Sequence, residues 1–290
     1  MRKQEMPGRK AWPWRTVSGL AGLIVTLGII TIAQSNVQDE DAEANQVLSG
    51  GAFGYTAPDG RRVLAPVGPS LAREMGRFSK VVAAPGLVVD ATFVAVRRTA
   101  AETADGQGPE AFDSTPGVIF ATGDPVPGST GVLVATEQFL AQRHVVPVTP
   151  VTPHPDCAPA VAEALTAHAG RAVLWCKDLA TVGDDGGRLS LARFAPQGRK
   201  QLVSLAYTGP GGPIYADHPA ETDPSGTWRA DDGGEFPVDN YRPLFAFRTG
   251  DGLEVAVRWS GAEGEIMDLY HQKGQTFQPF VAASWYRGIE

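Results

Sequence analysis

The chain has 290 residues, of which 43% are hydrophobic and 20% are charged, and its formal net charge is −7. Five basic residues against one glutamate give residues 1–35 a charge of +4, which leaves −11 on residues 36–290. An acidic body of this kind argues against binding nucleic acid or lying flat on anionic lipid, because both require a cationic surface. It is compatible with a basic partner protein and also with a charge that serves only solubility.

Residues 16–35, TVSGLAGLIVTLGIITIAQS, begin with 18 residues that carry no charge. A helix of that length spans about 27 Å, close to the hydrocarbon thickness of a bilayer. Basic residues precede the segment and acidic residues follow it at positions 39–43, so we expect a cytoplasmic segment (1–15), a transmembrane anchor (16–35) and a periplasmic body. Trp12 and Trp14 would lie at the inner interface of the cytoplasmic membrane, which the chain would cross once.

A cleaved export signal is the alternative, because small residues precede a potential signal peptidase cut after Ser35. The apolar segment is longer than the roughly 7–15 residues of a signal core, which favours retention. Ser18, Gly22 and Thr26 recur every four residues and place small side chains on one face of the helix. That stripe predicts close packing against an integral membrane partner, although glycine is also common in membrane helices without such a partner.

Behind the anchor, residues 36–51 have the polar, acidic composition of a solvated tether. Apolar runs separated by Gly, Pro, Asp and Thr then predict a β-rich domain over residues 52–145. Closely spaced prolines predict a stiff, extended connector over residues 146–156, with an edge strand as the competing interpretation. The remainder, residues 157–290, is predicted to be an α+β domain.

Cys157 and Cys176 are the two cysteines of the chain, and a periplasmic location favours a disulfide between them. Cys157 opens CAPAVAEALTAHAG, which has helical spacing, and Cys176 ends RAVLWC, a short apolar strand. The bond would fasten a helix to a strand and stabilise the fold by about 3 kcal/mol in the chain-entropy treatment. A redox dithiol or a metal site is the alternative, but redox pairs usually have the spacing C-x-x-C.

Asp-Gly sequences recur where tight turns would reverse the chain: PDG at 58–60, DDGG at 184–187 and 231–234, and GDG at 250–252. These residues tolerate positive φ, so they predict antiparallel hairpins; the alternating carboxylates of a calcium loop are missing. The predicted fold class is mainly β or α+β. It consists of a single N-terminal transmembrane helix and an antiparallel β-rich extracytoplasmic region, which the connector would divide into two halves.

Common catalytic motifs are missing, including G-x-S-x-G, H-E-x-x-H, S-x-x-K, C-x-x-C-H and a glycine-lysine phosphate loop. One loose group has the side chains of a metal site, provided that its cysteine is not bridged: His144, His154 and Cys157. Another would suit acid/base chemistry or a metal, or would be a charged turn without function: Asp217, His218, Glu221 and Asp223. We predict no catalytic, cofactor-binding or metal site from these patterns.

The C-terminal segment FQPFVAASWYRGIE carries an unusual aromatic load for a chain end. Its four rings, Phe277, Phe280, Trp285 and Tyr286, would either pack into the domain core or anchor an interface with a partner.

Three functions follow from these observations. The favoured one is a non-catalytic, membrane-anchored accessory subunit of a larger bacterial membrane complex, for example a respiratory or photosynthetic one, with integral membrane partners. An anchored periplasmic ligand-binding or sensing module is the first alternative. An envelope enzyme whose catalytic residues are scattered through the sequence is the second.

Overall fold

The structure, a computed structural model, describes residues 47–286 except 48, 69, 99–107, 224–225, 228–236 and 262–263. The predicted basic segment and anchor lie outside the described residues, together with Trp12, Trp14 and the stripe of Ser18, Gly22 and Thr26. No helix in the described part has both the length and the apolar character that crossing a bilayer requires. The chain from Ala44 to Glu290 forms one compact unit.

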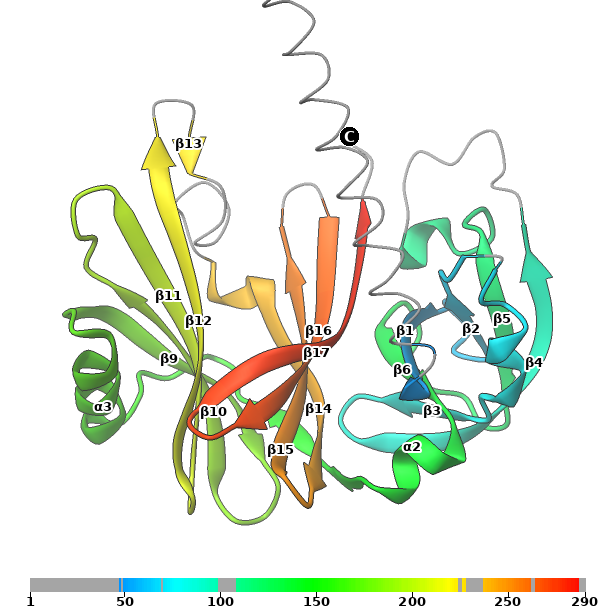
Figure 1. Cartoon of the computed structure of the whole chain (residues 1–290), viewed down its shortest axis with the longest axis horizontal. Helices are drawn as coiled ribbons and strands as arrows, with labels where there is room; N and C mark the ends of the chain where they lie inside the picture. The colour runs from blue at the N-terminus through cyan, green and yellow to red at the C-terminus, as the bar shows by residue number, and fades with distance from the viewer. Residues whose placement is uncertain are drawn as a thin grey trace, which may run out of the picture. The chain divides into compact units, whose positions relative to one another are not determined.

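The described chain is mainly β, which confirms the predicted β-rich class, and its strands form two sheets (Figure 1). The first is a closed antiparallel barrel in the order β1-β2-β5-β4-β3-β6. Its strands are β1 (Gly51–Thr56), β2 (Arg62–Ala65), β3 (Lys80–Ala83), β4 (Leu87–Arg97), β5 (Gly117–Thr122) and β6 (Gly131–Ala135). The short helices around it are η1 (Glu74–Arg77), η2 (Pro109–Ala111) and α2 (Glu137–Ala141).

The second sheet has eleven strands, ten of them in the order β7-β14-β15-β16-β17-β12-β11-β10-β9-β8, while β13 pairs with β12. Its first strands are β7 (His144–Val146), β8 (Val148–Pro150), β9 (Val173–Val182), β10 (Gly187–Phe194) and β11 (Lys200–Gly209). The others are β12 (Gly212–Asp223), β13 (Gly226–Thr227), β14 (Tyr241–Thr249), β15 (Gly252–Ser260), β16 (Gly264–Lys273) and β17 (Thr276–Tyr286). Two helices accompany them, α3 (Pro159–Ala169) and η3 (Val238–Asn240).

The two end strands of this sheet, β7 and β8, are consecutive in the chain and are separated only by Pro147. Because β7 pairs with β14 and β8 pairs with β9, Pro147 joins the opposite ends and the sheet is rolled round on itself. The backbone N–H of Gly183 donates to the carbonyl of Pro147 (2.9 Å), which fastens the junction. The segment predicted as a connector, residues 146–156, therefore includes strand pairing at both ends of the rolled sheet.

Tight turns lie where the Asp-Gly sequences predict them. Residues 183–186 connect β9 to β10, residues 250–251 connect β14 to β15, and residues 57–61 connect β1 to β2. Gly60 has φ +66°, and a Cβ there would overlap the carbonyl oxygen of Val126, so this turn requires glycine. The second DDGG, at 231–234, lies outside the described residues.

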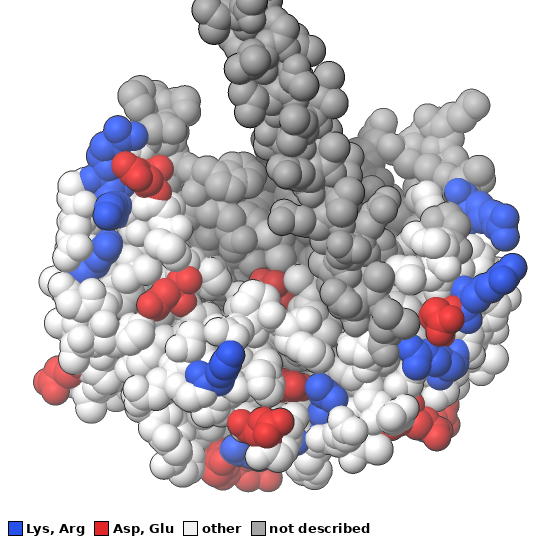
Figure 2. All heavy atoms as spheres, viewed as in Figure 1, with Lys and Arg blue, Asp and Glu red and all other residues white. Residues whose placement is uncertain are grey.

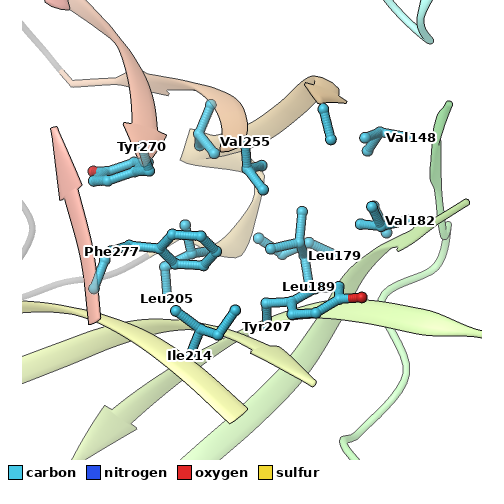
Figure 3. Packing of buried hydrophobic residues seen from close by; sticks show 14 of the residues in the cluster. Val148, Leu179, Val182, Leu189, Leu205, Tyr207, Ile214, Val255, Tyr270 and Phe277 are labelled. Carbon is cyan, nitrogen blue, oxygen red and sulfur yellow. The ribbon is translucent and has the colours of Figure 1, made fainter. Parts of the chain in front are cut away.

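The interior of the rolled sheet is filled by apolar side chains from both of its ends (Figure 3). Val148 and Val182 approach from β8 and β9, whereas Val255, Tyr270 and Phe277 approach from β15, β16 and β17. Alternation along each strand sends these side chains inward, and burying them out of water supplies the main force that holds the roll together.

A second apolar cluster joins the barrel to the rolled sheet. It includes Phe53 and Tyr55 of β1 together with Phe245 of β14, Met267 of β16 and Trp285 of β17. The Trp285 ring contacts the Tyr55 ring edge-on, with 5.4 Å between the centroids. The two sheets are therefore joined by continuous hydrophobic packing.

β-bulges account for some of the apolar strand residues that face water. Val94, Leu174 and Phe280 each lack a partner across the ladder, and each is exposed by between 45% and 56%. Leu179 and Leu244 are also unpaired at register shifts, but both are fully buried. A bulge adds one residue to one strand and re-aims its side chain, so three exposed apolar side chains follow from local geometry.

Candidate functional site

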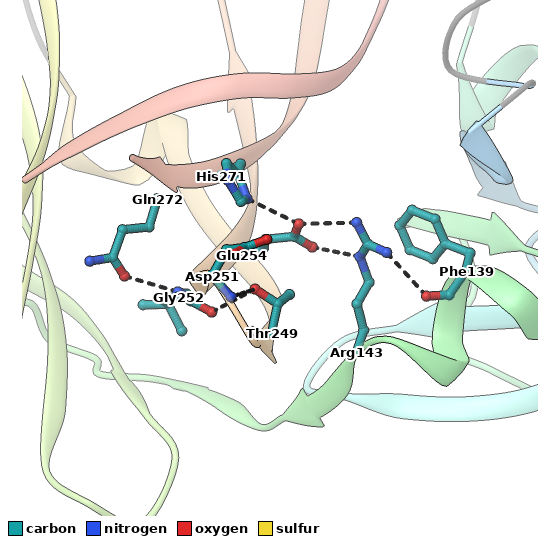
Figure 4. A network of polar contacts seen from close by, with 9 residues as sticks. Phe139, Arg143, Thr249, Asp251, Gly252, Glu254, His271 and Gln272 are labelled. Atoms are coloured by element: carbon teal, nitrogen blue, oxygen red, sulfur yellow. Dashed lines mark hydrogen bonds and ion pairs between the residues drawn. The ribbon is translucent and has the colours of Figure 1, made fainter. Parts of the chain in front are cut away.

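Polar side chains meet at the junction between the barrel and the rolled sheet (Figure 4). Arg143, just after α2, donates from Nε to Glu254 Oε2 (2.7 Å) and from Nη2 to Glu254 Oε1 (3.1 Å). His271 Nδ1 lies 3.2 Å from Glu254 Oε1. Glu254 on β15 is only 2% exposed, so its charge is neutralised inside the protein by a two-point contact with the guanidinium.

Local structure holds Arg143 in place. Thr136 caps α2 by accepting a hydrogen bond from the N–H of Phe139 (3.1 Å). One turn later, Arg143 Nη1 donates to the Phe139 carbonyl (3.1 Å), and its guanidinium lies 3.8 Å from the centre of the Phe139 ring. The Phe280 ring lies on the solvent side at 5.7 Å. Stacking and hydrogen bonding together fix the guanidinium in a single orientation.

A pocket of about 300 Å³ opens beside this ion pair and includes Gln142, Asp251, His271 and Phe280 in its lining. Both oxygens of Glu254 are engaged by Arg143, so the carboxylate is held as an ion-pair partner. His271 is the partly exposed member of the group. This arrangement ties the barrel to the rolled sheet through a buried charge pair.

A second pocket, of about 340 Å³, lies where β12 separates from β17. These two strands pair in parallel at a single position, Tyr215 with Thr276. Asp268, Tyr270 and His218 line the pocket, and the Tyr270 hydroxyl donates to Asp268 Oδ2 (3.2 Å). The polar groups and aromatic rings give this seam the general character of a small-ligand site.

The predicted cluster around His218 is divided by the strand that carries it. His218 lies near the rings of Tyr241 and Tyr270, whereas Asp217 contacts His168 of α3 at 2.9 Å. Neighbouring residues of a strand point to opposite faces, so one sequence cluster becomes two environments. The second carboxylate, Glu221, lies 3.8 Å from Arg199, and the side chain of the third, Asp223, is outside the described residues.

The His168 ring also stacks on Tyr215, with 3.8 Å between the centroids. Burial raises the pKa of the Tyr215 hydroxyl, and the negative charge of Asp217 raises it further. This contact packs α3 against β12 and uses the Asp217 carboxylate in doing so.

The second predicted group, His144, His154 and Cys157, is not assembled as a metal site among the described residues. Cys157 is bonded to Cys176, and His154 Nε2 contacts Asp239 Oδ1 (3.1 Å). His144 is exposed on β7, where it pairs with Arg248. A bridged cysteine has no thiolate to offer a metal.

The predicted disulfide between Cys157 and Cys176 is confirmed. It connects the start of α3 to β9, the helix and strand that the sequence indicates. Pro159 begins the helix, and Gly170 ends it in the left-handed region with φ +61°. Leu165 is the fully buried residue on the face of α3 that packs against the sheet.

The aromatic C-terminal segment forms β17. Phe277 and Trp285 are 3% exposed and belong to the two large cores, while Phe280 is exposed at its bulge. Tyr286 is the last residue of the strand, and its side chain is outside the described residues. A partner interface formed by these four rings stays a prediction. Among the three rings whose side chains are described, Phe280 is the accessible one.

Sequence reasoning missed the buried carboxylates of the rolled sheet. Glu265 is 1% exposed, accepts hydrogen bonds from Trp285 Nε1 and Ser260 Oγ (both 3.1 Å), and lies 3.7 Å from Arg258. Glu254 lies between the apolar residues Leu253 and Val255 of β15, and Glu265 directly precedes the apolar pair Ile266 and Met267 of β16. A charge at an inward position of an alternating strand is the signal that could have revealed them.

An apolar surface lies on the outside of the barrel along β4. Leu87, Val88, Phe93 and Val94 of this strand are exposed, at 38% or more of their surface. Beside them is a hollow of about 630 Å³ whose lining includes Arg73, Phe93, Val96 and Arg98. Exposed apolar side chains grouped on one element are typical of surfaces that contact another molecule.

Comparison of the chain with protein-family models, curated proteins and solved structures finds no match.

Proposed function

We propose that this chain is a non-catalytic, membrane-anchored accessory subunit of a larger bacterial membrane complex. The N-terminus would lie in the cytoplasm, one helix would cross the inner membrane, and the β body would lie in the periplasm. The observation that carries the proposal is the uncharged segment at residues 16–33, followed after a short acidic tether by a compact body from Ala44 onward.

The stripe of Ser18, Gly22 and Thr26 supports a partner within the membrane. Small side chains let two helices approach closely, and close packing is the main attraction available between helices in lipid. The partner is therefore expected to be an integral membrane protein whose helix packs against this face.

The buried charges of the β body favour a structural role for it. Asp178, Glu254 and Glu265 are the buried acidic residues of the described part, and each is bonded to neighbouring side chains. Carboxylates held in this way stabilise a fixed arrangement of strands. Together with the core shared by both sheets, they favour a rigid body that can hold a partner at a set distance from the membrane.

The test is purification of the tagged full-length chain from native membranes in mild detergent, followed by mass spectrometry. We expect stoichiometric recovery of integral membrane proteins and loss of that recovery in Gly22→Leu. Gly28→Leu is the matched control, because position 28 lies about 120° away from the centre of the stripe on a helix of 3.6 residues per turn. Equal recovery with both variants would remove the helix-packing argument, and a mature chain that starts at Asn36 and is released by osmotic shock would overturn the proposal.

An anchored ligand-binding module is the second candidate, and the seam pocket beside β12 favours it. Asp268 and Tyr270 provide polar groups there, and Phe277 provides an apolar wall. Purification as a lone monomer that carries a small molecule, with the molecule lost in Asp268→Ala, would favour this function over the accessory subunit.

A further inference from the structure

The hollow on the barrel combines positive charge with apolar surface. Arg73 and Arg98 flank Phe93 and Val96, and the lining contains no carboxylate among the described residues. Glu74 is the acidic residue closest to Arg73 in sequence, but its Oε2 lies 3.9 Å from Nε of Arg77 and forms an ion pair there. Neither Arg73 nor Arg98 forms an ion pair within the described ranges, and both residues are exposed.

The strand beside this hollow presents apolar side chains to solvent. Val94 is the extra residue of the β4–β5 bulge and is 55% exposed, next to Phe93 at 38%. Phe93 is supported from beneath by the buried ring of Phe120, with 6.2 Å between the centroids. Figure 2 shows Lys and Arg side chains, with Asp and Glu side chains among them, along the outer edge of the barrel, where β4 runs in Figure 1. The face therefore suits an anionic amphiphile: arginines for phosphate and apolar side chains for acyl chains.

The tether joins the barrel next to this face. Val47 is buried in the barrel core, and its carbonyl accepts a hydrogen bond from Arg77 Nη2 (2.9 Å). Arg77 ends η1, the helix that directly follows Arg73. Residues 36–46 separate the predicted anchor from Val47 and can extend at most about 40 Å. An anchored chain would therefore hold Val47 no farther than about 40 Å from the end of the anchor.

We propose that this barrel face, formed by Arg73, Arg98, Phe93, Val94 and Val96, docks on the anionic phospholipids of the membrane that holds the anchor. The proposal rests on the proposed function, because the anchor supplies the proximity. The arginines contact lipid phosphates, and Phe93 and Val94 enter the interfacial layer. The body as a whole is acidic and is repelled by anionic lipid, so the docked orientation is the one that presents this basic, apolar face.

The experiment uses the full-length chain reconstituted in lipid nanodiscs, with a polarity-sensitive fluorophore attached to Val94→Cys. The two native cysteines are bonded to each other and do not react with the label. Leu174→Cys is the matched control, because Leu174 is a bulge residue of similar exposure (56%) on the rolled sheet. Docking is read from quenching by lipids with spin labels on the acyl chains, in phosphatidylcholine discs with and without phosphatidylglycerol.

We expect strong quenching at position 94 only in discs that contain phosphatidylglycerol, and little quenching at position 174 in either. Each arginine near an anionic surface contributes a factor of roughly five, so Arg73→Gln/Arg98→Gln should lower the ratio of docked to undocked body about 30-fold. Equal quenching at positions 94 and 174, or quenching at 94 that is indifferent to phosphatidylglycerol and to both arginines, would overturn the proposal. A label that is shielded only when membrane partner proteins are present would also overturn it and assign the face to a protein.

The anchor is measured separately, by whether the chain resists extraction from native membranes with alkaline carbonate. A chain that resists extraction but shows no lipid contact at position 94 refutes the docking and leaves the accessory-subunit proposal intact. A chain that carbonate releases refutes the anchor, and the proposed function with it.

Discussion

The barrel and the rolled sheet bury different kinds of polar residue. The buried polar side chains of the described barrel region are all threonines: Thr56, Thr115, Thr122, Thr130 and Thr136. Those of the rolled sheet are carboxylates and serines: Asp178, Ser190, Ser204, Glu254 and Glu265. Both sheets are mainly antiparallel, with β12 and β17 as the parallel pair, and both are apolar inside. The difference therefore lies in how each sheet satisfies its buried hydrogen-bonding groups.

In the barrel, threonine hydroxyls serve neighbouring backbone groups. Thr56 Oγ1 donates to the Pro127 carbonyl (2.8 Å) and accepts from the N–H of Thr130 (3.1 Å). Thr122 Oγ1 donates to the Gly60 carbonyl (3.2 Å) in the same way. Each contact is neutral, so each contributes about 1 kcal/mol.

In the rolled sheet, buried carboxylates connect side chains from different strands. Asp178 of β9 accepts hydrogen bonds from Ser190 (2.7 Å) and Arg188 (3.3 Å) of β10, while Glu254 of β15 holds Arg143 from beyond α2. A buried charge is costly unless it is paired, so each acidic residue depends on its partner. The stability of the rolled sheet, and of its junction with the barrel, should therefore be the most sensitive to loss of one polar side chain.

The largest expected effect is the removal of Arg143. Arg143→Met leaves Glu254 buried without its cation, and we expect the free energy of unfolding to fall by about 3–5 kcal/mol. Urea denaturation of the full-length chain in detergent, followed by tryptophan fluorescence, measures this change. Thr56→Val is the barrel counterpart and should cost about 1–3 kcal/mol, because it removes only neutral hydrogen bonds.

The double variant Arg143→Met/Glu254→Leu sharpens the test. Because both charges are then absent, most of the lost stability should return, and a large cost that persists would show that packing around Arg143 matters more than the charge pair. A smaller loss in Arg143→Met than in Thr56→Val would contradict the contrast between the two sheets.

The second effect concerns the disulfide, which lies only in the rolled sheet. Cys157→Ala/Cys176→Ala is expected to lower the free energy of unfolding by about 3 kcal/mol, because the open chain of the unfolded state gains conformational freedom. Amide hydrogen exchange should show the first loss of protection in α3 and β9, with the barrel strands unaffected. Leu174→Ser, an exposed change near the bond, serves as the control and should stay within about 0.5 kcal/mol. Equal loss of protection in β1 and β6 would show that the two sheets unfold as one unit.

Some of this architecture could be predicted from the sequence because it depends on local signals. Asp-Gly turns mark the β9–β10 and β14–β15 hairpins, and the helix that begins at Pro159 follows from spacing, proline and glycine. The disulfide was predictable from the helix and strand on either side of it, together with the expectation of an oxidising compartment.

Other features depend on contacts between residues far apart in the sequence, and no local pattern carries them. The segment around Pro147 reads as an extended connector, yet its two halves pair with opposite ends of one sheet. Arg143 and Glu254 are separated by 111 residues, so their pairing depends on how the barrel meets the rolled sheet. Bulges such as that at Val94 depend on ladder register, which alternation alone does not fix.

The smallest effect concerns a titratable group that the barrel brings to the junction. Tyr55 is fully buried between Phe112 and Trp285, and this burial raises the pKa of its hydroxyl. The ordinary pKa of tyrosine is about 10. Below that pH, the hydroxyl is neutral in both the folded and the unfolded chain, so the group adds no pH dependence.

Above about pH 10, the unfolded chain releases this proton while the folded chain retains it, so stability falls as pH rises towards the raised folded pKa. In Tyr55→Phe, the unfolding free energy should therefore fall less steeply with pH between about pH 9.5 and 11. The slope should decrease by at most the amount that corresponds to one proton released per molecule on unfolding. Tyr215, whose pKa is also raised, should contribute to the pH dependence of stability that remains in Tyr55→Phe. Asp217→Asn should reduce the contribution of Tyr215, because it removes a nearby negative charge. Urea denaturation at several pH values across this range measures the slope of unfolding free energy against pH. If that slope is the same for the parent chain and for Tyr55→Phe, burial at the junction does not destabilise the ionised form of Tyr55. The barrel would then contribute no titratable group to set against the carboxylates of the rolled sheet.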